Sequence, residues 1–247
     1  MVFSHFTRPI WLFFDLDDTL WDFSRNSLES LHNVFEKFKE INSRFPSFND
    51  FLTLYRLHNS VLWKDFAEGK ISSESLKSER WRLTLFPDSD PAATPEICRA
   101  IDKEYLRCLA CQPHVIDGAF PMLEALSKDY MIAVLSNGFI DTQYLKLKYS
   151  GLWKYIARAV VSDEAGYQKP DPRLYEYAVN ATGAIGTPVM IGDNPDTDIL
   201  GALLAGWKTI WLNPCGNRLP LCRGVDPENF LGSAPDLKEV EKIIRSM

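Results

Sequence analysis

The sequence predicts an α/β protein: a five-stranded parallel sheet with a helical domain inserted after the first strand. Three observations predict this class. A short apolar run over 10–14 opens the chain, residues 22–112 have helical patterning without an evident strand, and short apolar runs alternate with helical segments from residue 113 onward. Such alternation with short connections is typical of right-handed βαβ units and a parallel sheet.

The first strand ends in acidic residues. Ile10–Phe14 is an unbroken apolar run, as expected for a strand buried on both faces, and Asp15, Asp17 and Asp18 follow it. Clustered carboxylates are costly to bury, and a divalent cation would remove the conflict. In an extended stretch Asp15 and Asp17 can face one site while Leu16 packs away from it. An acidic surface loop that caps a helix explains this stretch equally well.

The inserted block reads as four helices. Apolar residues from Leu28 to Phe38 recur at three- and four-residue spacing, and similar segments cover about 48–66, 72–85 and 94–109. The aromatic residues of this block either offer a face on which a nucleobase stacks or form the block's own core, and their helical spacing favours packing. They are Tyr55, Trp63, Phe66 and Trp81.

The remaining elements complete the α/β domain. Strands are expected over 131–135, 157–161, 188–191 and 207–212, and helices over 118–128, 141–149, 172–182, 199–205 and 236–246. The predicted domains are therefore a core made of 1–21 and 113–247 and a helical cap of 22–112.

Polar residues collect where these strands end. Ser136 and Asn137 follow the second strand, Lys169 lies in the loop after the third, and Asp193 follows the fourth. Each has an ordinary explanation by itself, since Ser136, Asp193 and Asp198 are suited to capping helices and Lys169 to solvent. Ligands bind outside the carboxyl ends of strands in open α/β sheets, so their joint occurrence there favours one shared site.

Composition excludes several other classes of function. The chain has 247 residues, of which 46% are hydrophobic, and a net charge of −6, which argues against a nucleic-acid partner. No stretch approaches the roughly 20 apolar residues that span a bilayer, and nothing resembles a secretory signal. Five cysteines without a framework spacing favour a reducing cytoplasm, and Cys108 and Cys111 lie in a helical context that suits neither zinc nor a redox centre.

The motifs in order resemble the haloacid dehalogenase superfamily of aspartate-nucleophile phosphohydrolases. The matching pattern is Asp15-x-Asp17-x-Thr19, Ser136, Lys169 and Gly192-Asp193-x-x-x-x-Asp198. The resemblance covers nearly the whole chain and implies a Rossmann-like core with flavodoxin-type strand order and an all-helical cap of the C1 type. A narrower likeness to bacterial pyrimidine 5′-nucleotidases rests on 59–72, Glu79-Arg-Trp81, Ser136-Asn-Gly-Phe139 and Trp211-Leu-Asn213.

The resemblance implies a role for each residue. Asp15 would be the nucleophile that forms an aspartyl-phosphate, and Asp17 the general acid and base. Asp15, the main-chain carbonyl of Asp17 and Asp193 would bind Mg²⁺. Ser136, Asn137 and Lys169 would bind the phosphoryl group, while Thr19 and Asp198 would hold the site in place.

The expected substrate is a small phosphorylated metabolite, most of all a nucleoside 5′-monophosphate with a pyrimidine base. A phosphosugar phosphatase or a phosphosugar mutase on the same scaffold is the alternative. A dehalogenase would need no metal and would leave Asp17 and the Asp193 loop unexplained. A non-enzymatic binding protein would not need the complete set of catalytic residue types.

Overall fold

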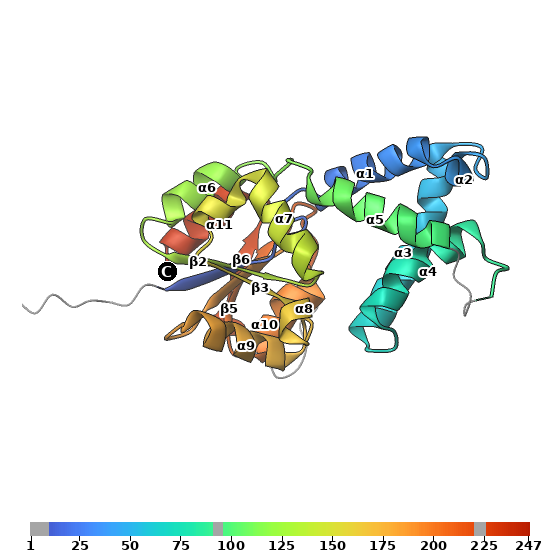
Figure 1. Cartoon of the computed structure of the whole chain (residues 1–247). Coiled ribbons are helices and arrows are strands. Elements are labelled where there is room, and N and C mark those ends of the chain that lie inside the picture. Colours follow the sequence, from blue (N-terminus) through green and yellow to red (C-terminus); the bar gives the residue numbers. More distant parts are fainter. Residues whose placement is uncertain (1–9, 91–95, 220–225) are drawn as a thin grey trace, which may run out of the picture. The chain divides into compact units, whose positions relative to one another are not determined.

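The computed structural model describes residues 10–90, 96–219 and 226–247. The chain divides into two compact units (Figure 1). One unit contains Met1–Phe23 and Pro113–Met247, and the other contains Ser24–Gln112. The helical unit thus begins at Ser24, close to the boundary expected at residue 22.

The first unit contains one sheet in which all neighbouring strands are parallel. In the described residues it has six strands in the order β3-β2-β1-β4-β5-β6. The strands are β1 (Trp11–Phe14), β2 (Met131–Ser136), β3 (Arg158–Val161), β4 (Val189–Gly192), β5 (Lys208–Leu212) and β6 (Phe230–Ala234). The α/β class is therefore confirmed, and the central strands carry the apolar runs that predicted them.

Two details of the expected sheet are corrected. The sixth strand, β6, was not predicted, because its sequence Phe-Leu-Gly-Ser-Ala is only partly buried at the sheet edge and pairs with β5 through a register shift. The strand order is also not the flavodoxin type, in which the third strand lies next to the first. Here β1 lies between β2 and β4, which is the order 3-2-1-4-5-6 of dinucleotide-binding folds.

Helices cover both faces of the sheet (Figure 1). On one face lie α6 (Ala119–Leu126), α7 (Ile140–Ser150) and α11 (Leu237–Arg245). On the other lie α9 (Pro172–Thr182) and α10 (Gly201–Leu204). The short elements are α8 (Ser162–Ala165), η2 (Leu152–Tyr155), the π-helical turn η3 (Pro195–Leu200) and η4 (Pro227–Asn229). Strands β2 and β3, which follow β1 in the sequence, lie on one side of β1, and β4 lies on its other side. The order of strands therefore reverses between β1 and β4. Such a switch point is where ligands bind.

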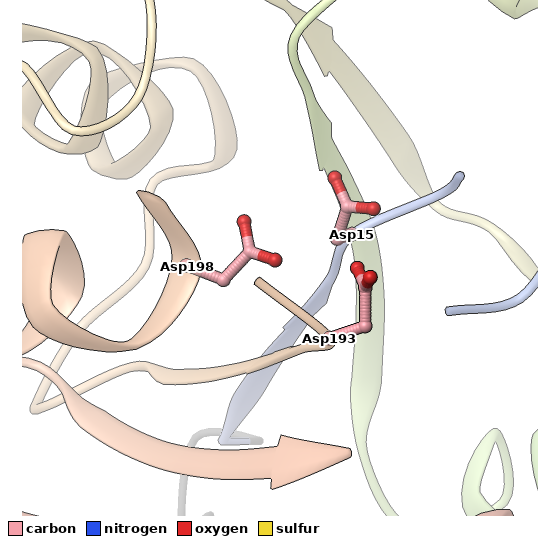
Figure 2. A group of neighbouring side chains, drawn as sticks. All are labelled: Asp15, Asp193 and Asp198. Atoms are coloured by element: carbon pink, nitrogen blue, oxygen red, sulfur yellow. The ribbon is translucent and has the colours of Figure 1, made fainter. Parts of the chain in front are cut away.

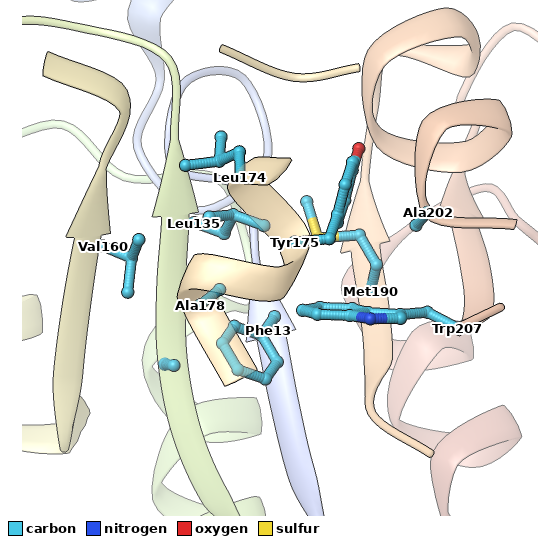
Figure 3. Packing of buried hydrophobic residues seen from close by; sticks show 10 residues of the cluster. Phe13, Leu135, Val160, Leu174, Tyr175, Ala178, Met190, Ala202 and Trp207 are labelled. Carbon is cyan, nitrogen blue, oxygen red and sulfur yellow. The ribbon is translucent and has the colours of Figure 1, made fainter. Parts of the chain in front are cut away.

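The apolar layer under α9 and α10 holds this switch point rigid (Figure 3). Phe13 of β1 packs against Trp207 with their ring centroids 4.7 Å apart, and Tyr175 of α9 meets the same indole edge-to-face at 5.3 Å. The Tyr175 hydroxyl donates a hydrogen bond to the carbonyl of Thr197 in η3. The core thereby fixes the turn that follows β4.

The second unit is helical, as expected. Its helices are α1 (Phe23–Lys37), α2 (Lys39–Asn42), α3 (Phe48–Ala67), α4 (Ser73–Leu85) and α5 (Glu96–Ala110), and residues 94–95 of the fourth expected helix lie outside the described residues. Ser47 and Ser72 cap α3 and α4 through bonds to the amides of Asp50 and Ser75.

The core of the helical unit is aromatic and contains a buried ion pair. Tyr55 and Trp81 are 2% and 0% exposed, and their ring centroids lie 4.8 Å apart. Packing therefore accounts for these two rings, whereas Trp63 and Phe66 are half-buried in edge-to-face contact at 5.8 Å. Asp102 accepts hydrogen bonds from Arg80 and from the Trp81 indole, which satisfies the buried guanidinium.

Among the described residues, no helix combines the length and the apolar character needed to cross a membrane.

Candidate active site

A cavity of about 230 Å³ lies at the carboxyl ends of the strands in the first unit. Asp15 is placed there directly after β1, because its amide donates to the Ile191 carbonyl of β4 (2.8 Å). The cavity is lined by Asp15, Asp17, Ser136, Asn137, Lys169, Asp193, Asn194, Thr197 and Asp198. Thus every predicted site residue except Thr19 lines one cavity. Thr19 is buried, and its hydroxyl donates to Asp193 Oδ1 at 3.3 Å.

Three carboxylates converge in this cavity (Figure 2). Asp15, Asp193 and Asp198 each offer an oxygen, and these oxygens lie within 4.8 Å of one another. Asp15 and Asp198 are 7% and 1% exposed, so water does little to screen their repulsion. The side chain of Asp17 does not belong to this group; it forms an ion pair with Lys146 instead.

Lys169 lies between two of these carboxylates. Its Nζ is 2.5 Å from Asp15 Oδ1 and 2.7 Å from Asp198 Oδ1, and it also donates to the Leu135 carbonyl at 2.8 Å. Burial lowers the pKa of Lys169, but attraction by Asp15 and Asp198 outweighs it and holds that pKa above the ordinary lysine value. The ammonium is therefore charged, and its three hydrogen-bond donors are used.

The cluster has three carboxylates, and Lys169 supplies one positive charge to it. Burial raises the pKa of Asp15 well above its ordinary value despite the attraction of Lys169, and the neighbouring aspartates add to the shift. Burial, followed by repulsion from Asp198 and Asp18, raises the pKa of Asp193 to about 7. The donor set therefore fits a hard divalent cation, since carboxylate oxygens are the ligands that Mg²⁺ prefers.

The loop after β3 is held by Asn137. The side-chain oxygen of Asn137 accepts from the Lys169 amide at 2.8 Å, and its Nδ2 donates to the Lys169 carbonyl at 2.9 Å. This pair of bonds fixes the main chain from which the lysine reaches into the cavity. The Lys169–Pro170 peptide bond is cis.

The turn after β4 is shaped around Asp198. A Cβ on Gly192 would lie 2.2 Å from Asp198 Oδ2, so only glycine fits there. Asp198 Oδ2 accepts from the amide of Asn194 at 3.1 Å, while Oδ1 accepts from Lys169 and, at 3.3 Å, from the Thr197 hydroxyl. Both oxygens of Asp198 are thus used within the protein, whereas Asp193 points its carboxylate into the cluster (Figure 2).

A family model of haloacid dehalogenase-like hydrolases matches residues 11–206. The chain belongs to this family. The match spans the first strand, the helical insertion and the strand ends that form the cavity.

Three known proteins resemble this chain over most of its length. The magnesium-bound structure of the HAD-hydrolase YfnB from Bacillus subtilis superposes with a TM-score of 0.79 at 28% identity, covering 96% of this chain and 99% of YfnB. The pyrimidine 5′-nucleotidase YjjG of Escherichia coli is 29% identical over 93% of this chain and 96% of its own length. The pyrimidine 5′-nucleotidase PynA of Streptococcus pneumoniae is 31% identical over 82% of this chain and 83% of its own.

Two polar residues on α7 were not identified from the sequence, and Trp211 of β5 was named only in the likeness to nucleotidases, without a role at the site. Gln143 Nε2 donates to Asp17 and to Ser136, and Lys146 donates to Asp17. Trp211 Nε1 donates to the Asp193 carbonyl at 2.8 Å. Gln143 and Lys146 are three residues apart, which places them on one side of the helix. In the sequence these two residues could have been recognised because they share a side of the helix with Leu147 and Ser150, which are buried.

Proposed function

We propose that this chain is a Mg²⁺-dependent phosphomonoester hydrolase that acts through an aspartyl-phosphate on Asp15. The observation that carries the proposal is the setting of the Asp15 carboxylate at the end of β1. It contacts the Lys169 ammonium and lies beside the carboxylates of Asp193 and Asp198. An in-line displacement at phosphorus requires this combination of a nucleophile, positive charge and a cation-binding group.

In the first step the Asp15 carboxylate attacks phosphorus. A bond forms between phosphorus and the carboxylate oxygen, and the bond from phosphorus to the ester oxygen breaks. Asp17 gives a proton to the leaving alkoxide, and Lys169 offsets negative charge at Asp15. In the second step a water oxygen bonds to phosphorus, and the bond from phosphorus to the Asp15 oxygen breaks. Asp17 takes a proton from that water, and inorganic phosphate leaves with the Asp15 carboxylate restored.

The phosphoryl oxygens require hydrogen-bond donors. The Ser136 hydroxyl accepts from Gln143 Nε2 at 2.6 Å, so its own hydrogen is available for a phosphoryl oxygen. The side chain of Asn137 is bonded to the Lys169 main chain. Asn137 would therefore bind a phosphoryl oxygen through its main-chain amide.

The cation would be held by the side chains of Asp15 and Asp193 and by the main-chain carbonyl of Asp17. Asp198, whose oxygens already accept bonds from Lys169 and Asn194, would fix the loop around it. When bound, Mg²⁺ supplies positive charge that stabilises the transferring phosphoryl group.

We assign the helical unit Ser24–Gln112 the role of a cap that selects the leaving group. The favoured substrate is a pyrimidine nucleoside 5′-monophosphate, supported by the two nucleotidase relatives and by the likeness of 59–72 to the caps of such enzymes.

A phosphate-release screen tests the proposal. The panel combines nucleoside 5′-monophosphates with sugar phosphates, each with Mg²⁺ and with chelator, and the Asp15→Asn variant is the control. We expect Mg²⁺-dependent phosphate release, fastest with pyrimidine nucleotides and absent in the variant. Isomerised sugar phosphate with little free phosphate would instead identify a mutase. Full activity of Asp15→Asn would show that Asp15 is not the nucleophile.

A further inference from the structure

The helix α7 carries two buried polar side chains toward the cavity. Gln143 is 1% exposed and Lys146 is 3% exposed, although both are long and polar. Burying an ammonium and an amide is costly unless each finds a partner. Their shared partner is Asp17, the residue to which we assign the proton transfers.

Both oxygens of the Asp17 carboxylate are held. Lys146 Nζ lies 2.7 Å from Oδ1 and 2.9 Å from Oδ2, and Gln143 Nε2 lies 3.0 Å from Oδ2. An ionised carboxylate has about four acceptor sites, so these three bonds leave one, on Oδ1. Since the Asp17 side chain is 27% exposed and lines the cavity, that site on Oδ1 is where a proton can be exchanged with substrate or water.

Gln143 connects this carboxylate to the phosphate-binding hydroxyl. Its Nε2 bonds both Asp17 Oδ2 and Ser136 Oγ, and the carboxylate identifies the bonded atom as the amide nitrogen. Gly138 leaves room for this amide, because a Cβ at residue 138 would lie 2.8 Å from Gln143 Nε2. One amide thereby links the Asp17 carboxylate to the Ser136 hydroxyl.

Lys146 also contacts aromatic rings. Its Nζ lies 4.5 Å from the centroid of Trp21 and 5.4 Å from that of Phe23, both in the segment that follows Asp17. Cation–π contact and the Asp17 ion pair together fix the ammonium. A lysine held by these contacts restricts the rotation of the carboxylate that it contacts.

We propose that Gln143 and Lys146 are positioning residues that orient the Asp17 carboxylate for proton transfer to the leaving alkoxide. The inference rests on the proposed function, because it gives Asp17 the acid–base role. Proton transfer requires the donor within hydrogen-bond reach of the leaving oxygen, and small displacements cost rate. Lys146 acts through Asp17, and Gln143 acts through Asp17 and Ser136; neither is assigned a contact with the substrate.

The test compares substrates that differ in their need for a proton. A nucleoside 5′-monophosphate leaves as an alkoxide and requires the acid, whereas p-nitrophenyl phosphate leaves as a stable phenolate. The variants are Lys146→Met and Gln143→Met, which keep chain length and remove the donors. Lys148→Met, an exposed lysine on the same helix, is the matched control, and Asp17→Asn is the reference.

We expect kcat/KM for the nucleotide to fall about 10- to 100-fold in Lys146→Met and Gln143→Met, as for other residues that orient a catalytic group. The fall in kcat/KM for p-nitrophenyl phosphate should be much smaller. This ratio reports the step in which the leaving group departs and not the hydrolysis of the aspartyl-phosphate, which is common to both substrates. Lys148→Met should match the wild type on both substrates. Circular dichroism establishes that each variant is folded at the assay temperature, and the retained aryl phosphatase activity reports the same.

The substrate comparison separates the positioning role of Lys146 and Gln143 from the acid–base role of Asp17. Equal losses on both substrates, or no loss, in Lys146→Met and Gln143→Met would overturn the positioning role while Asp17→Asn still shows the leaving-group dependence. If Asp17→Asn itself shows no such dependence, the acid–base role of Asp17 is wrong and the positioning role falls with it.

Discussion

The ammonium of Lys169 lies 2.5 Å from the carboxylate of Asp15, the group to which we assign the attack on phosphorus. The two residues come from loops 154 positions apart, and both are nearly inaccessible to water. The same ammonium also contacts Asp198, so Lys169 joins Asp15 to the turn after β4. These two contacts fix the position of the Asp15 carboxylate.

A double-mutant cycle on this pair should show strong coupling. Lys169→Met leaves two buried carboxylates without a counter-charge, which we expect to lower the free energy of unfolding by about 3 to 5 kcal/mol. Asp15→Asn should cost less, since Lys169 keeps Asp198. Urea unfolding with chelator present is the measurement, and the double variant should lose clearly less than the sum of the single losses. Simple additivity would mean that the two side chains do not interact.

Mg²⁺ should stabilise the protein more at pH 8 than at pH 5.5. Asp193 has a raised pKa of about 7, so its contribution to stability is present at low pH and is lost as pH rises through 7. The cation replaces the lost proton, and at 100 times its dissociation constant it adds about 2.7 kcal/mol. The measurement is the shift in melting temperature on adding Mg²⁺ at each pH.

Two variants define the site of this Mg²⁺ effect. Asp193→Asn should remove most of the gain at pH 8, whereas Asp196→Asn, an exposed neighbour in the same turn, should keep it. A shift that is the same in Asp193→Asn as in the wild type would place the cation elsewhere.

The buried ion pair of the helical unit should matter far more than its exposed ones. Arg80 and Asp102 are 2% and 6% exposed, and removal of Asp102 leaves the guanidinium without its carboxylate partner. We expect Asp102→Ala to cost about 3 to 5 kcal/mol of unfolding free energy. Arg107→Ala breaks an exposed pair with Glu104 and should cost far less, because water and salt screen that pair. Chemical denaturation followed by far-ultraviolet circular dichroism compares the two, and equal losses would contradict the burial of the first pair.

The cysteines should differ sharply toward an alkylating reagent. Cys98 is 0% exposed, and burial raises the pKa of its thiol to about 11. Cys111 and Cys215 are exposed. Iodoacetamide at neutral pH should therefore modify Cys111 and Cys215 in the folded protein and Cys98 only after unfolding. Peptide mass mapping reads out the labels, and modification of Cys98 at a similar rate in the folded protein would refute its burial.

The sequence was informative wherever a short apolar run ended in a polar residue. Asp15, Ser136 and Asp193 could be placed at one edge because parallel strands deliver their carboxyl ends to the same side. The strand order could not be predicted in this way, because an apolar run indicates a strand but not which strands pair with it. The edge strand β6 was missed for a related reason: a half-exposed strand containing Gly232 and Ser233 carries no apolar run.

The contacts of Asp17 illustrate what spacing alone leaves open. The pattern Asp15-x-Asp17 predicts that both carboxylates face one cavity, and both line it. It does not reveal that Asp17 is bonded to Lys146, because that contact joins residues 129 positions apart. Lysines on helices are usually solvated, so only the packing of α7 on Trp21 distinguishes Lys146 from the exposed Lys148.

The most direct measurement is to locate the phosphoryl group on the enzyme during turnover. Acid quenching with the favoured nucleotide and Mg²⁺, followed by borohydride reduction and peptide mapping, converts a phosphorylated aspartate into homoserine at its own position. We expect homoserine at residue 15 in the wild type and none in Asp15→Asn. Phosphate release without a mark at residue 15, or a mark on another residue, would contradict Asp15 as the nucleophile.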